Sequence, residues 1–181
     1  MNIVLLGAPG AGKGTQAEKI SMHLQLSHIS TGEILRDAVE KKTTLGVKAK
    51  SYMDQGDLVP DDIMISLIKE VLPENKDFLL DGFPRTLDQA IALDQSLDKE
   101  GKAIHLAINL DVSRELLMVR MEKRGRSDDN RQTIERRLDN YDKQTLPLIE
   151  YYKSQGKLKS VDGNQIIGVV ENSILELLEA R

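Results

Sequence analysis

The residues whose types and spacing most clearly indicate chemistry lie between Gly7 and Thr15, a stretch that reads GAPGAGKGT. Its glycines let the backbone approach an anion closely and turn successive N–H groups into one concavity. Lys13 adds a point charge that can reach the outer phosphates of a nucleotide. An apolar run at residues 3–6 precedes the loop, and residues 16–24 carry apolar side chains at helical spacing. This order of strand, glycine turn and helix N-terminus predicts a phosphate-binding site.

The loop departs from the general pattern at the magnesium position. Gly14 stands where a Ser or Thr usually follows the lysine, and Thr15 comes one place later. We therefore expect magnesium to be held through water, with a carboxylate elsewhere sharing the task. Asp81, directly after the apolar run 78–80, has the right position at a strand end, although a turn residue before Gly82 is the alternative. Such loops occur in ATPases, GTPases and kinases, so the loop alone does not choose the reaction.

Composition limits the class of protein. A chain of 181 residues with 40% hydrophobic and 30% charged residues is typical of one ordinary domain. The net charge of −4 argues against a nucleic-acid or membrane-surface binder. The absence of cysteine rules out disulfides and cysteine-ligated zinc, so we expect no structural zinc. No apolar run of about 18 residues and no signal peptide are found, which favours a cytoplasmic protein, and we expect a monomer.

Positive charge is concentrated in one part of the chain: seven of the ten arginines fall within residues 114–137. Arg120 and Arg124 are four apart and share a helix face. Together with Arg126 and Arg137 they bracket a polar loop hinged at Gly125, where a lid that closes over phosphate would lie. The remaining three are interpreted as a solvated helix face: Arg114, Arg131 and Arg136.

Five strand-like runs, at residues 2–6, 27–29, 77–80, 104–110 and 158–161, alternate with helical patterns. This alternation predicts a parallel sheet with helices on both faces and ligands at the carboxyl ends of the strands. Residues 37–58 read as two short helices, broken near 42–44 and at Gly56, which indicates a peripheral insertion able to move. Pro60 and Asp61 are expected to begin the next helix, over residues 62–72.

Two motifs follow strands of the predicted sheet. Residues 30–36 read STGEILR, in which Thr31 and Arg36 can face the crevice at the strand ends. Residues 81–86 read DGFPRT, in which Phe83 and Pro84 form a stiff apolar ledge that supports Arg85. So many arginines around one crevice favour two polyphosphate ligands over one.

Taken in order, GAPGAGKGTQ, HISTGEILR, GDLVPD, LLDGFPRTLDQA and RSDDN resemble the adenylate kinase family in its short-lid form, from residue 1 to about 165. The resemblance implies a P-loop NTPase-type three-layer α/β fold with a five-stranded parallel sheet. It implies reversible, Mg²⁺-dependent transfer of the terminal phosphoryl group of ATP to AMP, giving two ADP. A single domain is expected, with a core (1–29, 60–124, 133–181), a mobile AMP-binding insertion (30–59) and a short lid (125–132).

The resemblance also implies site residues. ATP would contact Gly10, Ala11, Gly12, Lys13, Gly14, Thr15, Arg120, Arg124, Gly163 and Gln165. AMP would contact Thr31, Arg36, Asp57, Leu58, Val59, Gly82, Phe83, Pro84, Arg85, Gln89, Arg126 and Arg137. Catalytic roles would fall on Lys13, Arg85, Arg120, Arg124, Arg126 and Arg137. Asp81 would direct Mg²⁺, and Gln165 departs from relatives that carry lysine at its position.

Without a zinc site, we expect the lid to be stabilised by Asp128 and Asp129 pairing with arginines. A uridylate or cytidylate kinase is the nearest alternative, and Thr31, Thr86 and Gln89 favour adenine over it. A P-loop nucleotide hydrolase or switch, or a P-loop binding module, would not need the second arginine-lined site. An inactive scaffold is a third alternative, which the presence of both a loop lysine and a ledge arginine makes poor.

Overall fold

The computed structural model describes residues 1–126 and 129–179, and its central feature is a parallel sheet in the order β2-β3-β1-β4-β5. The strands are β1 (Ile3–Gly7), β2 (Ser27–Ser30), β3 (Phe78–Asp81), β4 (Leu106–Asp111) and β5 (Leu158–Asp162). The predicted five-stranded parallel sheet is confirmed, with each strand ending about one residue beyond its predicted end. Leu5 lies in register with Asp81, the last residue of β3, and Gly7, the last residue of β1, with Leu110 on β4, so these strands end at the same edge of the sheet with a stagger of a few residues.

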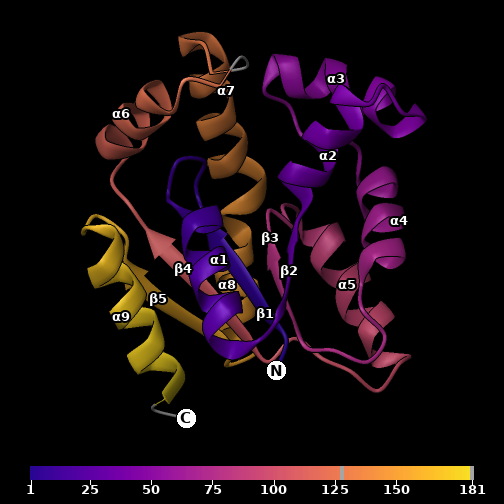
Figure 1. Ribbon diagram of the computed structural model, residues 1–181, viewed down its shortest axis with the longest axis vertical. Coiled ribbons are helices and arrows are strands. Elements are labelled where there is room, and N and C mark those ends of the chain that lie inside the picture. Colours follow the sequence, from indigo (N-terminus) through magenta and orange to yellow (C-terminus); the bar gives the residue numbers. More distant parts are fainter. Residues whose placement is uncertain (127–128, 180–181) are drawn as a thin grey trace.

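Helices cover both faces of this sheet (Figure 1). They are α1 (Lys13–Leu24), α2 (Thr31–Glu40), α3 (Thr44–Gln55), α4 (Asp61–Val71), α5 (Leu87–Asp98), α6 (Arg114–Arg124), α7 (Arg131–Asn140), the π-helix η1 (Tyr141–Thr145), α8 (Pro147–Ser154) and α9 (Ile167–Glu179). Of these described helices, none is long and apolar enough to cross a membrane.

The core has two halves because side chains alternate across a strand. Val4 and Leu6 of β1 face a cluster that includes residues of α4, α5 and α8. Ile3 and Leu5 face the opposite cluster, built with α1, α6, α7 and α9. The middle strand is therefore buried on both faces, as expected for a parallel sheet.

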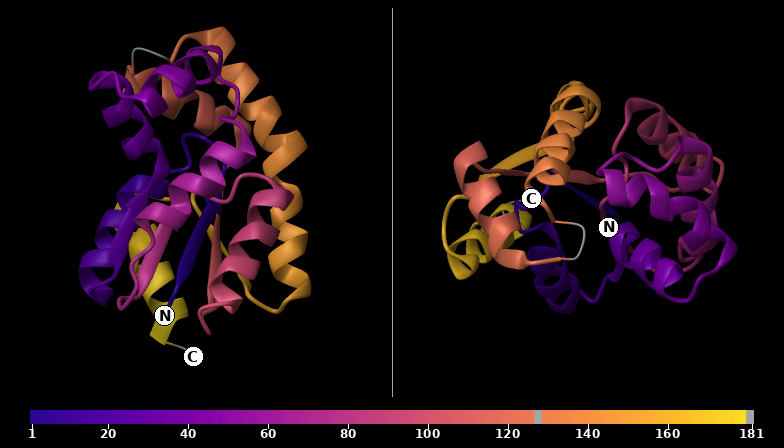
Figure 2. Two further views of the ribbon diagram at one scale, coloured as in Figure 1. Left: turned by 90° about the vertical axis from the view of Figure 1, so that its right-hand side faces the viewer. Right: turned by 90° about the horizontal axis from the view of Figure 1, so that it is seen from above.

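The insertion consists of α2 and α3, as predicted, and lies at the end of the molecule opposite both termini (Figures 1 and 2). Thr43 begins α3 by accepting a hydrogen bond from the N–H of Gly46. Gly46 packs so closely on α2 that a Cβ atom there would lie 2.0 Å from the carbonyl oxygen of Ala38. Gly56 ends α3 with φ of 79°, a conformation that favours glycine.

The helical segment after the lid is interrupted near Pro147, where a proline within a helical pattern predicts a kink. The structure has a π-helical turn at Tyr141–Thr145, and α8 begins at Pro147. The N–H of Leu146 donates to the carbonyl of Tyr141, five residues back. Since proline has no N–H to donate, the ordinary bond of the next turn cannot form, and the extra residue is accommodated upstream.

Candidate functional site

A cavity of about 700 Å³ opens at the carboxyl ends of the strands. Its walls come from the loop after β1, the start of α2, the exit from α3, the turn after β3, and helices α6 and α7. This volume lies within the range of small-molecule sites. Most of the residues predicted for the site line it: Gly10, Gly12, Lys13, Gly14, Thr15, Thr31, Arg36, Asp57, Leu58, Val59, Asp81, Gly82, Pro84, Arg85, Gln89, Arg120, Arg124, Arg126 and Arg137.

The loop between β1 and α1 has the geometry of an anion cradle. α1 begins at Lys13, and Gly12 precedes it with φ of 95°. The ammonium of Lys13 donates hydrogen bonds to the carbonyl oxygens of Gly7 at 2.8 Å and Ala8 at 3.1 Å, so its side chain lies back across the loop. Loop N–H groups, a helix N-terminus and an ammonium group thus converge on one side of the cavity.

The electrostatics around Lys13 favour an anionic ligand. Burial lowers the pKa of Lys13 to about 8; Asp81 opposes the shift, and Arg85, Arg124 and Arg126 add to it. Several cations therefore lie near one another with Asp81 as their nearby counter-ion. A phosphate group entering the cavity would relieve this repulsion.

Asp81 ends β3 and is only 8% exposed. One of its oxygens accepts a hydrogen bond from the hydroxyl of Ser30 at 3.4 Å. The same oxygen would lie 3.5 Å from a Cβ atom placed on Gly14, so the carboxylate borders the phosphate loop. A single carboxylate beside a phosphate loop suits Mg²⁺ that keeps most of its water. Across the described residues, no cluster of three metal-ligating side chains exists.

On the opposite wall, the turn after β3 holds Arg85. Its Nε donates to the carbonyl oxygen of Gly82 at 2.7 Å. Gly82 has φ of 84°, and a Cβ there would lie 2.7 Å from the hydroxyl of Thr31, so the turn requires glycine. Burial lowers the pKa of the Arg85 guanidinium, Asp81 opposes this, and Arg137 and Arg36 lower it further. This second group of cations is also suited to an anion.

Gln89 is 1% exposed and lines the cavity with its amide held at both ends. Its Oε1 accepts from the N–H of Arg85 at 2.7 Å, and its Nε2 donates to Oδ1 of Asp61 at 2.6 Å. Thr86 caps α5 by accepting from the N–H of Gln89, and its hydroxyl donates to Oδ2 of Asp61 at 2.9 Å. Asp61 was expected only to help begin a helix, so its link to the site is new.

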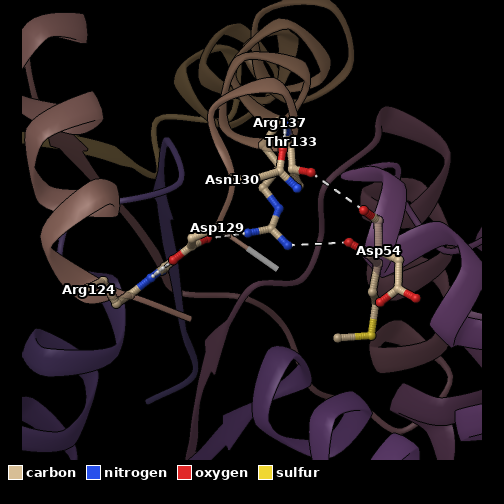
Figure 3. A network of polar contacts seen from close by, with 7 residues as sticks. Asp54, Arg124, Asp129, Asn130, Thr133 and Arg137 are labelled. Atoms are coloured by element: carbon tan, nitrogen blue, oxygen red, sulfur yellow. Dashed lines mark hydrogen bonds and ion pairs between the residues drawn. The ribbon is translucent and has the colours of Figure 1, made fainter. Parts of the chain in front are cut away.

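The lid carries a carboxylate between two arginines (Figure 3). Asp129 accepts from Arg124 through both oxygens at 2.8 Å and from Arg137 at 2.7 Å. Burial raises the pKa of Asp129, but hydrogen bonding and charge from Arg124, and the charge of Arg137, bring it below the usual value. The predicted pairing is thus confirmed for Asp129, whereas Asp128 lies outside the described residues.

The helix that follows the lid, α7, contacts the insertion. Arg137 donates to the carbonyl oxygen of Met53 at 3.4 Å, and Thr133 donates to that of Asp54 at 3.5 Å (Figure 3). Arg136 pairs with the carboxylate of Asp57 through two nitrogens. Arg136 is 52% exposed, as the interpretation of a solvated face predicts, and its pair with Asp57 additionally connects α7 to the insertion.

The other two arginines of that group are exposed, as predicted, and pair with acids on the surface. Arg114 pairs with Asp139 and Asp142, and Arg131 pairs with Glu135 on its own helix. Each is at least 46% exposed.

Four predicted residues do not line the cavity: Ala11, Phe83, Gly163 and Gln165. Phe83 is 1% exposed and packs in the core, so the ledge presents Pro84 to the cavity and buries the ring. Arg120 donates to the carbonyl oxygens of Ala11, Gly163 and Gln165, which places these three around the guanidinium group of Arg120.

Several residues that line the cavity were not predicted from the sequence, among them Pro9, Glu18, His28, Met53, Asn140, Tyr141 and Thr145. A signal existed for three of them. Asn140, Tyr141 and Thr145 recur at helical spacing after Arg137, and thus continue the face of the helix that already held a predicted residue.

A phosphate loop and a second arginine-lined anion site within one cavity define a P-loop nucleotide phosphotransferase. The sequence profile described as adenylate kinase matches residues 5–157. Adenylate kinase 1 of Synechocystis sp. is 48% identical over 98% of this chain and 96% of its own length. The adenylate kinases of Syntrophomonas wolfei (42%; 99% and 100%) and Bacteroides fragilis (44%; 99% and 97%) are also similar. The chain belongs to the adenylate kinase family.

This membership confirms the expected reaction at the level of the whole protein, which is phosphoryl transfer between ATP and AMP with ADP as product. It favours that reaction over the uridylate or cytidylate kinase and over the nucleotide hydrolase.

Proposed function

We propose that the two sides of the cavity hold the two substrates of this reaction, with ATP on the loop of Lys13 and AMP against Arg85. The observation that carries the proposal is that the loop of Lys13 and the turn of Arg85 line one cavity together with Asp81, whose carboxylate borders Gly14. The donor and acceptor phosphates would therefore meet beside one carboxylate. Phosphoryl transfer needs such close alignment of two anionic groups.

The proposed chemistry consists of charge neutralisation and alignment. No protein nucleophile is required, because the phosphate of AMP is already anionic near neutral pH. Lys13 would contact the outer phosphates of ATP, and Arg85 would orient the phosphate of AMP. Four further arginines would balance the charge that develops during transfer: Arg120, Arg124, Arg126 and Arg137.

Magnesium would accompany ATP and be directed by Asp81 through water. The carboxylate, its position beside Gly14 and the lack of a full set of protein ligands in the described part of the chain fit a hydrated Mg²⁺ shared with phosphates. When bound, the ion supplies neutralisation of the outer phosphate oxygens.

We assign residues 30–59 to the AMP side and residues 125–132 to a lid, and propose that both move toward the substrates on binding. Two observations support this: Asp129 of the lid is bonded to Arg137 of α7, and Arg137 and Thr133 of α7 are in turn bonded to the backbone of the insertion. Closure would exclude water, which otherwise competes as phosphoryl acceptor.

The remaining assignments concern the protein in its setting. We further propose that the protein acts as a monomer. We propose a cytoplasmic enzyme of nucleotide biosynthesis that maintains the balance of ATP, ADP and AMP. A net charge of −4 supports partners that are these small molecules and not nucleic acid or membrane.

The direct test is to mix the purified chain with ATP, AMP and magnesium and to quantify the nucleotides. Two ADP should form for each ATP consumed, and ATP alone should release no inorganic phosphate. CMP and UMP should be turned over more slowly than AMP. Faster turnover of CMP or UMP, or steady phosphate release without any monophosphate, would contradict the proposal.

A further inference from the structure

We propose that Asp61 is a positioning residue that fixes the orientation of the Gln89 amide, and through it the preference for a 6-aminopurine over a 6-oxopurine. The inference rests on the proposed function, because it takes the base of the acceptor nucleotide to lie against Gln89. Asp61 does not line the cavity itself. Its two carboxylate oxygens are divided between Gln89 and Thr86.

The two ends of the Gln89 amide face groups of opposite hydrogen-bonding character. The group facing Oε1 is the N–H of Arg85, which can only donate. The group facing Nε2 is the carboxylate of Asp61, which in its ionised form can only accept. Turning the amide over would place two donors together at one end and two acceptors together at the other. The amide therefore has one orientation.

Asp61 is itself held in place by a second hydrogen bond. Its other oxygen accepts from Thr86, whose hydroxyl in turn accepts from the backbone N–H of Gln89. α4 and α5 pack against each other, and the carboxylate, the hydroxyl and the amide form a closed ring of hydrogen bonds between the first turns of the two helices. Asp61 therefore cannot rotate away from Gln89 without also losing its hydrogen bond to Thr86.

An amide of fixed orientation can distinguish between the purine bases of the acceptor nucleotide. After these bonds, Gln89 keeps one N–H and one lone pair of Oε1. Adenine presents an amino donor at C6 and an acceptor at N1, which an amide of fixed orientation can match as a pair. A 6-oxopurine presents an acceptor and an N–H at the same two places, so it needs the amide turned over. The ring around Asp61 forbids that turn, and a 6-oxopurine is rejected because buried polar groups stay unpaired.

Asp61→Ala tests the role, with inosine monophosphate as the probe, since it differs from AMP only at the C6 and N1 positions. The KM for AMP should rise about tenfold, and the preference in kcat/KM for AMP over inosine monophosphate should fall by at least about tenfold. The kcat with AMP and the KM for ATP should stay within about twofold. A preference unchanged in Asp61→Ala would overturn the proposal.

Two variants separate the hydrogen bond from charge. Asp61→Asn keeps an oxygen that accepts from Gln89 and should retain the preference within about threefold. Asp62→Ala removes the same charge from the same first turn of α4, where the side chain is exposed, and should behave like the wild type. If Asp61→Asn or Asp62→Ala loses the preference for AMP as fully as Asp61→Ala does, the negative charge and not the orientation of the amide is responsible, and the inference is wrong.

If Asp61→Ala does not fold, Asp61→Ser serves, because it keeps a polar residue at the helix start while being too short to hold the Gln89 amide in place. Gln89→Leu separates a failure of the proposed acceptor site from a failure of the positioning role of Asp61. A Gln89→Leu variant with unaltered KM for AMP would contradict the proposed acceptor site itself. A raised KM in Gln89→Leu together with an unchanged preference in the Asp61 variant would contradict the positioning role alone.

Discussion

At the scale of the residue, the site is a small volume crowded with cations. Lys13 lies across its own loop and bonds to two carbonyl oxygens, while Arg85 bonds to the carbonyl of Gly82. Asp81 is the nearby acid that opposes the lowering of both pKa values. Such an arrangement is costly while empty and favourable once phosphates enter, which is how binding energy can be directed to the reacting groups.

Lys13→Met should lower kcat by about 10²- to 10³-fold, since one charge aimed at the transferring group commonly contributes this much to the transition state. Lys19→Met is the matched control: it lies on the same helix but pairs with Glu171, away from the cavity. Steady-state kinetics with both variants provides the check, and equal losses would place the effect in the helix and not in the loop.

The affinity of the free enzyme for ATP should depend on pH through Lys13. The pKa of about 8 means that the ammonium is charged below pH 8 and loses its proton above it. Because only the charged form attracts phosphate, the Kd for ATP should rise about tenfold per pH unit above 8. Calorimetric titration between pH 7 and 10 measures this, and Lys13→Met should remove the dependence. An affinity that strengthened above pH 8 would contradict the assignment.

Arg85→Ala should reduce kcat/KM for AMP by at least about a hundredfold, because a buried arginine on a phosphate is difficult to replace. The Kd for ATP should change by less than about threefold. Arg131→Ala, on the surface, is the control for general loss of positive charge. An equal loss for both nucleotides would mean that the division of the cavity between them is incorrect.

Residues within a local motif could be predicted from the sequence, and residues joined by tertiary contacts could not. GAPGAGKGT identifies its own lysine, and DGFPRT places both Asp81 and Arg85 at a strand end. Asp61 and Gln89 are 28 positions apart, and Arg136 and Asp57 are 79 apart. Nothing local marks either pair, since only the packing of one helix on another brings them together.

At the scale of the element, α7 and the end of α3 are connected by polar contacts, while the buried apolar residues of these two helices belong to different core clusters. Arg124 and Arg137 share Asp129 within the lid, and α7 reaches α3 through the backbone of Met53 and Asp54. Hydrogen bonds of this kind can be exchanged for bonds to a ligand at small net cost. Segments joined in this way are suited to open and close.

Asp129→Ala should loosen the start of α7, because Arg124 and Arg137 would then face each other without the carboxylate between them. Amide hydrogen exchange at residues 129–138 should become about tenfold faster, while exchange in β1 and β4 stays unchanged. Asp139→Ala, on the exposed face of the same helix, is the control. Unaltered exchange at the start of α7 would show that Asp129 does not hold the lid.

Elements were predicted well where apolar periodicity was strong. The five strands follow from it, with ends displaced by one or two residues, because the last residues of a strand are set by the neighbouring strand. The two helices of the insertion were also predicted, but α2 begins at Thr31 and not near residue 37. The π-helical turn before Pro147 was not predicted, since it depends on a hydrogen bond five residues back that leaves no pattern in the sequence.

At the scale of the whole molecule, the sheet brings the ends of β1, β2 and β3 to one edge, where the two nucleotides are proposed to meet (Figure 1). The phosphate loop follows β1, the STGEILR segment follows β2, and the DGFPRT turn follows β3. Ser30 and Asp81 lie in register on adjacent strands. The fold thus accounts for one cavity with two groups of cations, which is the arrangement that transfer between two nucleotides requires.

The most direct measurement is calorimetric binding of a bisubstrate mimic, two adenosines joined through five phosphates, to the wild-type chain. One mimic should bind per chain, more tightly than ATP or AMP alone, and the saturated protein should bind neither ATP nor AMP. A saturated protein that still bound AMP, or a mimic held no more tightly than ATP, would contradict the claim that both nucleotides occupy this cavity at once.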